Sequence, residues 1–175
     1  MEQVRDGDPS ALGELFERHH QSLYRFFVRM TGDRVKAEDL VQEVFVRMLK
    51  YGHTFRSSSE FGPWMFALAR HAAVDLHRRG RKHLSEDPEA PEQPATGPQP
   101  IEALQSAERL QQLNRALAGL SVGLRDALLL ARFSELKYAE IGDLLGISEG
   151  AVKARVHRAV GELKAAYRVR TEEER

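Results

Sequence analysis

The stretch from Tyr138 to Ala165, YAEIGDLLGISEGAVKARVHRAVGELKA, decides the fold of the C-terminal part of this chain. It predicts two amphipathic helices joined by a tight turn. Gly146 allows the first helix to end with a positive φ angle, and the Ser148 hydroxyl can cap the second by accepting a backbone N–H. In the second helix the apolar side chains recur at helical spacing and form one stripe: Val152, Val156, Ala159, Val160 and Leu163. This pattern is typical of a helix-turn-helix.

The opposite side of the second helix carries small and cationic residues, namely Gly150, Lys153, Ala154, His157, Arg158 and Gly161. Small residues let a backbone approach a surface closely, and cations suit phosphate. A recognition helix meets the major groove of DNA in this way. The alternative is an ordinary surface helix pair with solvated cations, but pattern and spacing together favour DNA binding.

The net charge of zero results from cancellation between blocks. Residues 51–83 carry six Lys or Arg against two acidic residues, and residues 148–170 carry six against two. Between them, residues 84–108 carry six acidic residues and no Lys or Arg. Such asymmetry indicates different partners for different segments.

Composition excludes several classes of protein. The 175 residues include no cysteine, so disulfide and thiolate chemistry are excluded, and no apolar run approaches membrane-spanning length. The first ten residues lack a signal-peptide core, so we expect a soluble, cytoplasmic protein. The seven histidines form no HExxH motif, and no nucleophile–base motif or phosphate loop stands out. We therefore expect no metal, no cofactor and no catalytic residues.

The segment 84–100, LSEDPEAPEQPATGPQP, holds five of the seven prolines and predicts an extended linker. It divides the chain into an N-terminal domain (8–83), an acidic linker with the start of the next helix (84–108), and a C-terminal domain (109–170). Both domains are predicted to be helical, because no β-alternation of useful length is present. The predicted helices ahead of the helix-turn-helix run from Asp8 to Gly32, from Asp33 to a loop over Tyr51–Glu60, from Phe61 to Arg79, and over Ile101–Leu120 and Leu124–Phe133. The expected fold is all-α, with two small helical domains.

Three stretches in this order resemble the extracytoplasmic-function (ECF) sigma factors of bacterial RNA polymerase: AEDLVQEVFVRML (37–49), FGPWMFALARHAAVDLHRRGR (61–81) and the segment 113–164. The resemblance implies a sigma region 2-like bundle followed by a region 4-like helix-turn-helix domain. It also implies a transcription initiation factor that binds core RNA polymerase and promoter DNA and is held by an anti-sigma factor. The linker would thread toward the active-site cleft of the polymerase.

The resemblance assigns site residues to three surfaces. The second helix has a polar edge formed by Asp39, Gln42, Glu43 and Arg47 beside Phe45. Polymerase binding is expected there, from Asp39, Leu40, Gln42, Glu43 and Phe45. Without the resemblance this edge would be interpreted as a solvated acidic face. Recognition and melting of the minus-ten element are expected from Phe55, Arg56, Ser57, Ser58, Ser59, Phe66, Arg70, His71, His77, Arg78 and Arg79, because aromatic groups stack bases and cations hold the backbone. Binding to the minus-thirty-five element is expected from Ser148, Glu149, Gly150, Lys153, Arg155, His157 and Arg158.

Some positions depart from the family pattern. His71 stands where Asn is common, at a position associated with the minus-ten base pocket, and Ser121 replaces a usual Pro. Ala151 and Ala154 replace a Thr and a Ser of the recognition helix, which removes two hydroxyls that reach phosphate or base edges. Two alternatives remain open: a response-regulator-type transcription factor, and a sigma-like protein-interaction module without promoter use.

Overall fold

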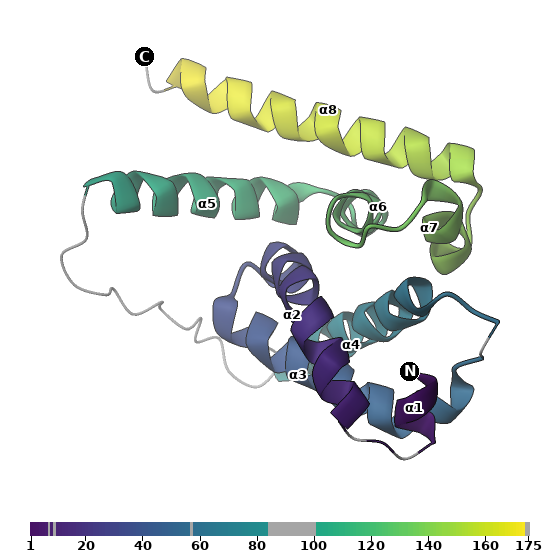
Figure 1. The fold of residues 1–175 in the computed structure, drawn as a ribbon. Coiled ribbons are helices and arrows are strands. Elements are labelled where there is room, and N and C mark those ends of the chain that lie inside the picture. Colours follow the sequence, from purple (N-terminus) through teal and green to yellow (C-terminus); the bar gives the residue numbers. More distant parts are fainter. Residues whose placement is uncertain (7, 9, 57, 84–100, 174–175) are drawn as a thin grey trace.

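The computed structural model describes residues 1–6, 8, 10–56, 58–83 and 101–173, and the regular structure within these ranges is all helical (Figure 1). The elements are α1 (Glu2–Arg5), α2 (Ser10–Thr31), α3 (Arg34–Tyr51), the 3₁₀ turn η1 (Gly52–Thr54), α4 (Phe61–His83), α5 (Ile101–Gly119), α6 (Val122–Phe133), α7 (Tyr138–Leu145) and α8 (Glu149–Glu173). The all-α prediction is confirmed. The predicted linker over 84–100 lies outside the described residues.

The predicted helix boundaries depend on local hydrogen bonds that the structure contains. Asp8 Oδ1 accepts the backbone N–H of Ser10 at 2.9 Å at the start of α2. Gly32, with a φ of 72°, follows the end of α2, and Asp33 Oδ1 caps α3 by accepting from Lys36 N at 3.1 Å. These contacts satisfy backbone groups that a helix end would otherwise leave unpaired.

The short helix α1 was not predicted, because four residues show no periodicity. Its Val4 is buried, and Met1 packs so closely on η1 that a β-carbon at Gly52 would lie 3.1 Å from Met1 Cε. The N-terminal residues therefore support the turn that follows α3.

Helices α2, α3 and α4 enclose the core of the N-terminal domain. Its largest fully buried side chains are Leu23, Phe26, Phe27, Val44, Met48, Met65 and Phe66. Phe26 meets Phe66 edge to face, with ring centroids 5.5 Å apart. This aromatic contact joins α2 to α4.

The helix-turn-helix in α7 and α8 has the predicted turn. Gly146 adopts a φ of 66°, Ile147 N donates to Gly142 O at 2.9 Å, and Ser148 Oγ accepts from Ala151 N at 3.2 Å. Gly142 is required at the crossing, since a β-carbon there would lie 2.7 Å from the carbonyl oxygen of Ile147. This requirement at Gly142 was not predicted from the sequence.

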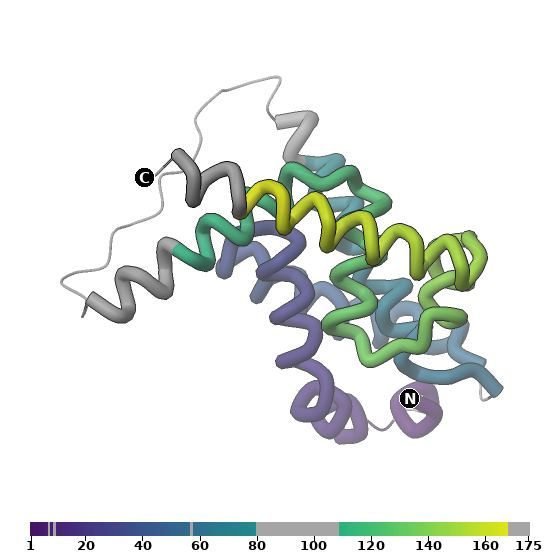
Figure 2. The backbone as a smooth tube through the Cα atoms, turned by 90° about the horizontal axis from the view of Figure 1, so that it is seen from above, coloured from purple at the N-terminus to yellow at the C-terminus, as the bar shows by residue number. Residues whose placement is uncertain are grey.

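The two domains pack against each other. One continuous hydrophobic cluster includes buried residues from both, with α2 against α5 and α6, and α4 against α7. Figure 2 shows α8 crossing above α6 on the side away from the N-terminus. The sequence could not decide whether the domains lie apart or together, and in this structure they lie together.

Candidate nucleic-acid interface

The outer face of α8 is open to solvent. The predicted residues Ser148, Glu149, Gly150, Lys153, His157 and Arg158 are all exposed there, as is Ala154. Lys153 Nζ lies 2.7 Å from Glu149 Oε1, and this carboxylate raises the pKa of Lys153. Within the described parts of the chain, no ion pair engages His157 or Arg158. The face can therefore approach a phosphate backbone without first breaking a tertiary contact.

Arg155 lies elsewhere on the helix. It is half-buried, and its Nη1 would lie 3.2 Å from a β-carbon placed on Gly123, near the start of α6. The side chain therefore packs back onto α6, whereas the resemblance had grouped it with the residues expected to bind the minus-thirty-five element.

The outer face of α3 combines polar and apolar groups. Val35, Val46 and Leu49 are 68%, 57% and 56% exposed, and Asp39 and Gln42 are exposed between them. Positions 35, 39, 42, 46 and 49 alternate in steps of four and three, which is the spacing of a coiled-coil seam. The face therefore has the geometry to receive a partner helix.

Three of the residues predicted for polymerase binding do not lie on this seam, namely Leu40, Glu43 and Phe45. Leu40 and Phe45 are buried, and the Phe45 ring packs against Phe16 with centroids 5.0 Å apart. Val35, Val46 and Leu49 were not among the predicted site residues. Their heptad spacing was a readable signal, but apolar residues on a helix are first interpreted as core.

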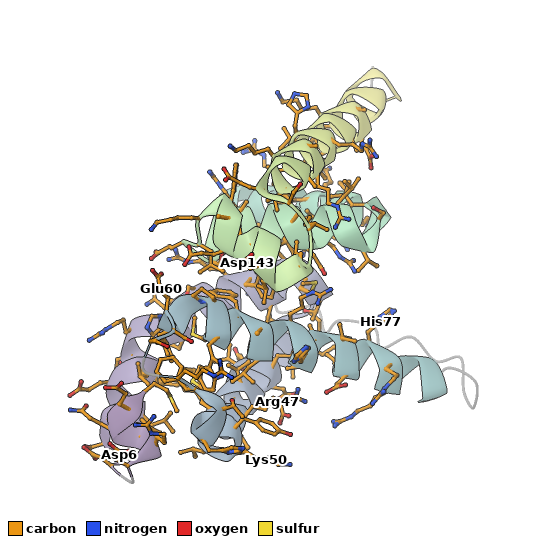
Figure 3. The ribbon with its side chains drawn as sticks, turned by 90° about the vertical axis from the view of Figure 1, so that its right-hand side faces the viewer. Asp6, Arg47, Lys50, Glu60, His77 and Asp143 are labelled. Atoms are coloured by element: carbon orange, nitrogen blue, oxygen red, sulfur yellow. The ribbon has the colours of Figure 1, made fainter. Side chains whose placement is uncertain are left out.

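Arg47 (labelled in Figure 3) joins α3 to α4. Its Nε lies 2.7 Å from Glu43 Oε1 and its Nη2 lies 2.9 Å from Asp75 Oδ2. Burial of Arg47 opposes its charge, but these two hydrogen bonds outweigh burial and raise its pKa. The hydrogen bond from Arg47, helped by the charges of Arg78 and Arg79, lowers the pKa of Asp75. Glu43 is thus committed to a bond within the domain.

A surface cavity of about 380 Å³ lies between α3, η1 and α4. It is lined by Arg47, Tyr51, Thr54, Leu68, His71, Val74 and Asp75. The lining combines the rings of Tyr51 and His71, the apolar side chains of Leu68 and Val74, and the Asp75 carboxylate, which accepts a hydrogen bond from Arg47. Such a site can stack a flat ring and accept hydrogen bonds from its amino groups.

Of the residues predicted for the minus-ten element, the structure brings only His71 to this cavity. Arg56, Ser58 and Ser59 are exposed in the loop ahead of α4, and His77, Arg78 and Arg79 are exposed along α4, where His77 is labelled in Figure 3. Ser57 lies outside the described residues.

Three predicted minus-ten residues point inward instead. Phe66 is 1% exposed, and Phe55 packs against Trp64 with ring centroids 5.4 Å apart. Both rings fill the core in this structure, so neither presents a free face on which a base of the minus-ten element could stack. Arg70 Nε donates to Asp126 Oδ2 at 3.1 Å, across the contact between the domains. Trp64 donates its indole N–H to Thr54 Oγ1 at 3.2 Å.

In the described part of the chain, no group of three His, Cys, Asp or Glu residues has the arrangement of a metal site. None of the helices described is both long and apolar enough to cross a membrane.

Comparison with known proteins agrees with this arrangement. Two family profiles match, Sigma-70 region 2 over residues 15–83 and Sigma-70, region 4 over residues 110–163. The chain is 33% identical to the ECF RNA polymerase sigma factor SigM of Bacillus subtilis, over 89% of this chain and 94% of SigM. It is 33% identical to the RNA polymerase sigma factor CarQ of Myxococcus xanthus, over 94% of this chain and 93% of CarQ. The sigma factor RpoE, solved in complex with the anti-sigma factor NepR from Bartonella quintana, superposes with a TM-score of 0.70 at 26% identity, over 90% of this chain and 96% of RpoE. The chain therefore belongs to the extracytoplasmic-function sigma factors of the sigma-70 family.

Proposed function

We propose that this protein binds core RNA polymerase and directs it to specific promoters, recognising and melting the minus-ten element with the N-terminal domain and binding the minus-thirty-five element with α8. The observation that carries this proposal is the presence of two exposed recognition faces on one short chain, the seam of α3 and the outer face of α8. Catalysis belongs to the polymerase, and we place the protein in the cytoplasm with it. The described N-terminal domain is helical, whereas a response-regulator receiver would require an α/β pattern.

The polymerase would bind the seam formed by Val35, Asp39, Gln42, Val46 and Leu49. A partner coiled coil can cover the apolar residues and offer cations to Asp39. This assignment differs from the sequence prediction because Leu40 and Phe45 support the helix from within, and Glu43 is paired with Arg47.

The seam can be tested by converting Val46 and Leu49 to Glu in one variant. Two charges in an apolar contact should reduce capture of core polymerase at least about tenfold, or about 1.4 kcal/mol. Val122→Glu is the matched control, since Val122 is 62% exposed on α6, away from the seam. Unchanged capture by the double variant would remove polymerase binding from this face.

The cavity beside His71 would hold one unstacked base of the minus-ten element, stacked on an aromatic ring. Asp75, held by Arg47, can accept from a base amino group, and Arg78, whose Nη2 lies 3.7 Å from Asp75 Oδ1, can meet the phosphate backbone of the strand. Replacing His71 by Asn should shift the preferred base on a randomised promoter library, because the amide both donates and accepts. An unchanged preference would place the base elsewhere.

Two further observations extend the proposal. The outer face of α8 lacks hydroxyls at Ala151 and Ala154, so binding to the minus-thirty-five element would depend on Lys153, His157 and Arg158. RpoE was solved with an anti-sigma factor, and we propose that a partner of that class also holds this chain.

Run-off transcription with purified core polymerase tests the whole proposal. Transcripts should start at promoters enriched from the library, and only when this protein is added. A chain that binds the polymerase without promoter-dependent transcripts would instead be an interaction module.

A further inference from the structure

The cavity between α3, η1 and α4 has two walls of different construction. One wall consists of side chains of α4, a long helix whose backbone hydrogen bonds fix their spacing. The other includes Tyr51 and Thr54, which lie at the two ends of the three-residue turn η1. A 3₁₀ turn of this length has few hydrogen bonds of poor geometry to stiffen it. The position of this second wall therefore depends on what packs against η1.

Helix α1 packs against both η1 and α2 (Figure 1). Val4 is 9% exposed, whereas the three other residues of α1 are exposed. Val4 and Met1 are three positions apart and so lie on one face of the helix. On that face a β-carbon at Gly52, in η1, would lie 3.1 Å from Met1 Cε. The buried face of α1 thus supports the turn from behind.

Asp8 fixes the other end of α1. Its backbone N–H donates to the carbonyl oxygen of Gln3 at 2.9 Å, and its Oδ1 accepts from the backbone N–H of Ser10 at 2.9 Å. A helix of four residues is not stable by itself, so tertiary contacts must hold it in place. Helix α1 is therefore a brace between the first turn of α2 and η1.

A single hydroxyl carries the position of η1 across the cavity. Thr54 Oγ1 donates to the carbonyl oxygen of Tyr51 at 2.7 Å and accepts from Trp64 Nε1, in the first turn of α4, at 3.2 Å. A shift of η1 would break the bond to Trp64 and move the Tyr51 ring relative to α4. The width of the cavity is thus set by the elements behind η1.

We propose that α1 positions the cavity beside His71, and that Val4 holds Tyr51 and Thr54 at the separation from α4 that selects one base of the minus-ten element. Val4 touches no base and acts only through η1. A cavity that can widen fits different bases about equally well, so loosening this wall lowers discrimination. The inference rests on the proposed function for its effect on promoter choice, but the position of η1 can be measured without DNA.

Val4→Asp tests the brace, because a carboxylate is strongly disfavoured in a buried apolar position. Trp64 is the only tryptophan of the chain, so its fluorescence reports on η1 directly. Its emission should shift to longer wavelength as the bond to Thr54 opens to water. Gln3→Asp is the matched control, since it places the same charge on the exposed side of the same helix. Thr54→Val removes the accepting oxygen and should give the shift alone, and adding Val4→Asp to it should change little more.

Base selectivity provides the functional readout. On a randomised minus-ten library with core polymerase, the preference for the favoured base should fall about fivefold in Val4→Asp and stay unchanged in Gln3→Asp. Capture of polymerase and affinity for a minus-thirty-five duplex should not change, a separation that general loss of folding would not produce. Val4→Ile keeps the buried face apolar and should retain both the emission and the selectivity.

Unchanged emission in a folded Val4→Asp variant would show that α1 does not place η1. Shifted emission with unchanged selectivity would show that the position of η1 does not select the base, and an equal loss of minus-thirty-five affinity would make the role of Val4 merely structural. Each of these three results overturns the proposal. If the wild-type chain supports no promoter-dependent transcription while Val4→Asp still shifts the emission of Trp64, the proposed function fails and the placement of η1 by α1 stands.

Discussion

Helices α4 and α8 both carry cations, but the cations are held in different ways. On α8, His157 and Arg158 face solvent without an ion pair among the described residues, and Lys153 is paired only with Glu149 one turn away. On α4, Arg70 is bound to Asp126 and Arg78 lies 3.7 Å from Asp75. The basic side chains on the outer face of α8 are available at once, whereas Arg70 on α4 must first leave its carboxylate. A helix with many cations is therefore not by itself a DNA-binding surface, since the nearest carboxylate decides when each cation can act.

The largest expected effect follows from removing the exposed basic side chains of α8. Replacing Lys153, His157 and Arg158 with Ala should weaken binding to a minus-thirty-five duplex about tenfold or more, because fewer phosphates are then neutralised. The slope of log affinity against log salt should become shallower by about one for each phosphate that no longer meets a cation. Fluorescence anisotropy at several salt concentrations measures both quantities. If the triple variant kept the wild-type salt slope, α8 would not lie on the phosphate backbone.

A second prediction separates two arginines of the same helix. Because Arg155 packs on Gly123, Arg155→Ala should lower the free energy of unfolding by roughly 1 kcal/mol and leave the salt slope of DNA binding unchanged. Arg158→Ala should leave the free energy of unfolding unchanged and make the salt slope of DNA binding shallower. Denaturant titration and anisotropy on both variants check this pair. An equally reduced salt slope in both variants would return Arg155 to the outer face.

The smallest expected effect concerns the carboxylate that restrains α4. The hydrogen bond from Arg47 lowers the pKa of Asp75 from its ordinary value of 3.8. A lowered pKa in the folded state adds stability that is fully present above the unfolded pKa and is lost as the pH falls through the folded one. The stability difference between wild type and Asp75→Asn should therefore be constant near neutral pH and shrink below about pH 4. Denaturant titrations across pH measure it, with Glu17→Gln as an exposed control, and a difference that grew in acid would contradict the pairing.

The helices and their ends could be predicted because their determinants are local. Asp33, Gly146 and Ser148 act on backbone groups within a few residues, and the apolar stripes repeat within each helix. The burial and the bonding partners of individual side chains could not be predicted in the same way. Phe66 was expected to act on the minus-ten element and lies in the core, since its contact with Phe26 depends on how α2 and α4 cross. The partner of Arg70 is 56 residues away and belongs to the other domain.

The seam of α3 was missed for a different reason. Val35, Val46 and Leu49 have the composition of a core stripe, and only the burial of the opposite side of the helix shows that they face outward. When a helix has two apolar stripes, the sequence pattern cannot tell which stripe is buried and which is exposed. Only the tertiary structure shows this, because the other helices cover one stripe and leave the other open to solvent.

The close crossing at Gly142 has a consequence for how promoter preference can change. Because the backbone of α7 meets the carbonyl oxygen of Ile147 with no room for a side chain, the angle between α7 and α8 is set by the backbone and does not depend on the residues of the outer face. Positions 150, 153, 154, 157 and 158 can then be exchanged as a set without moving the scaffold that presents them. The residues that would contact DNA can therefore be replaced without changing how α7 and α8 are arranged. Grafting the outer-face residues of a relative onto this scaffold is a direct route to a new minus-thirty-five preference.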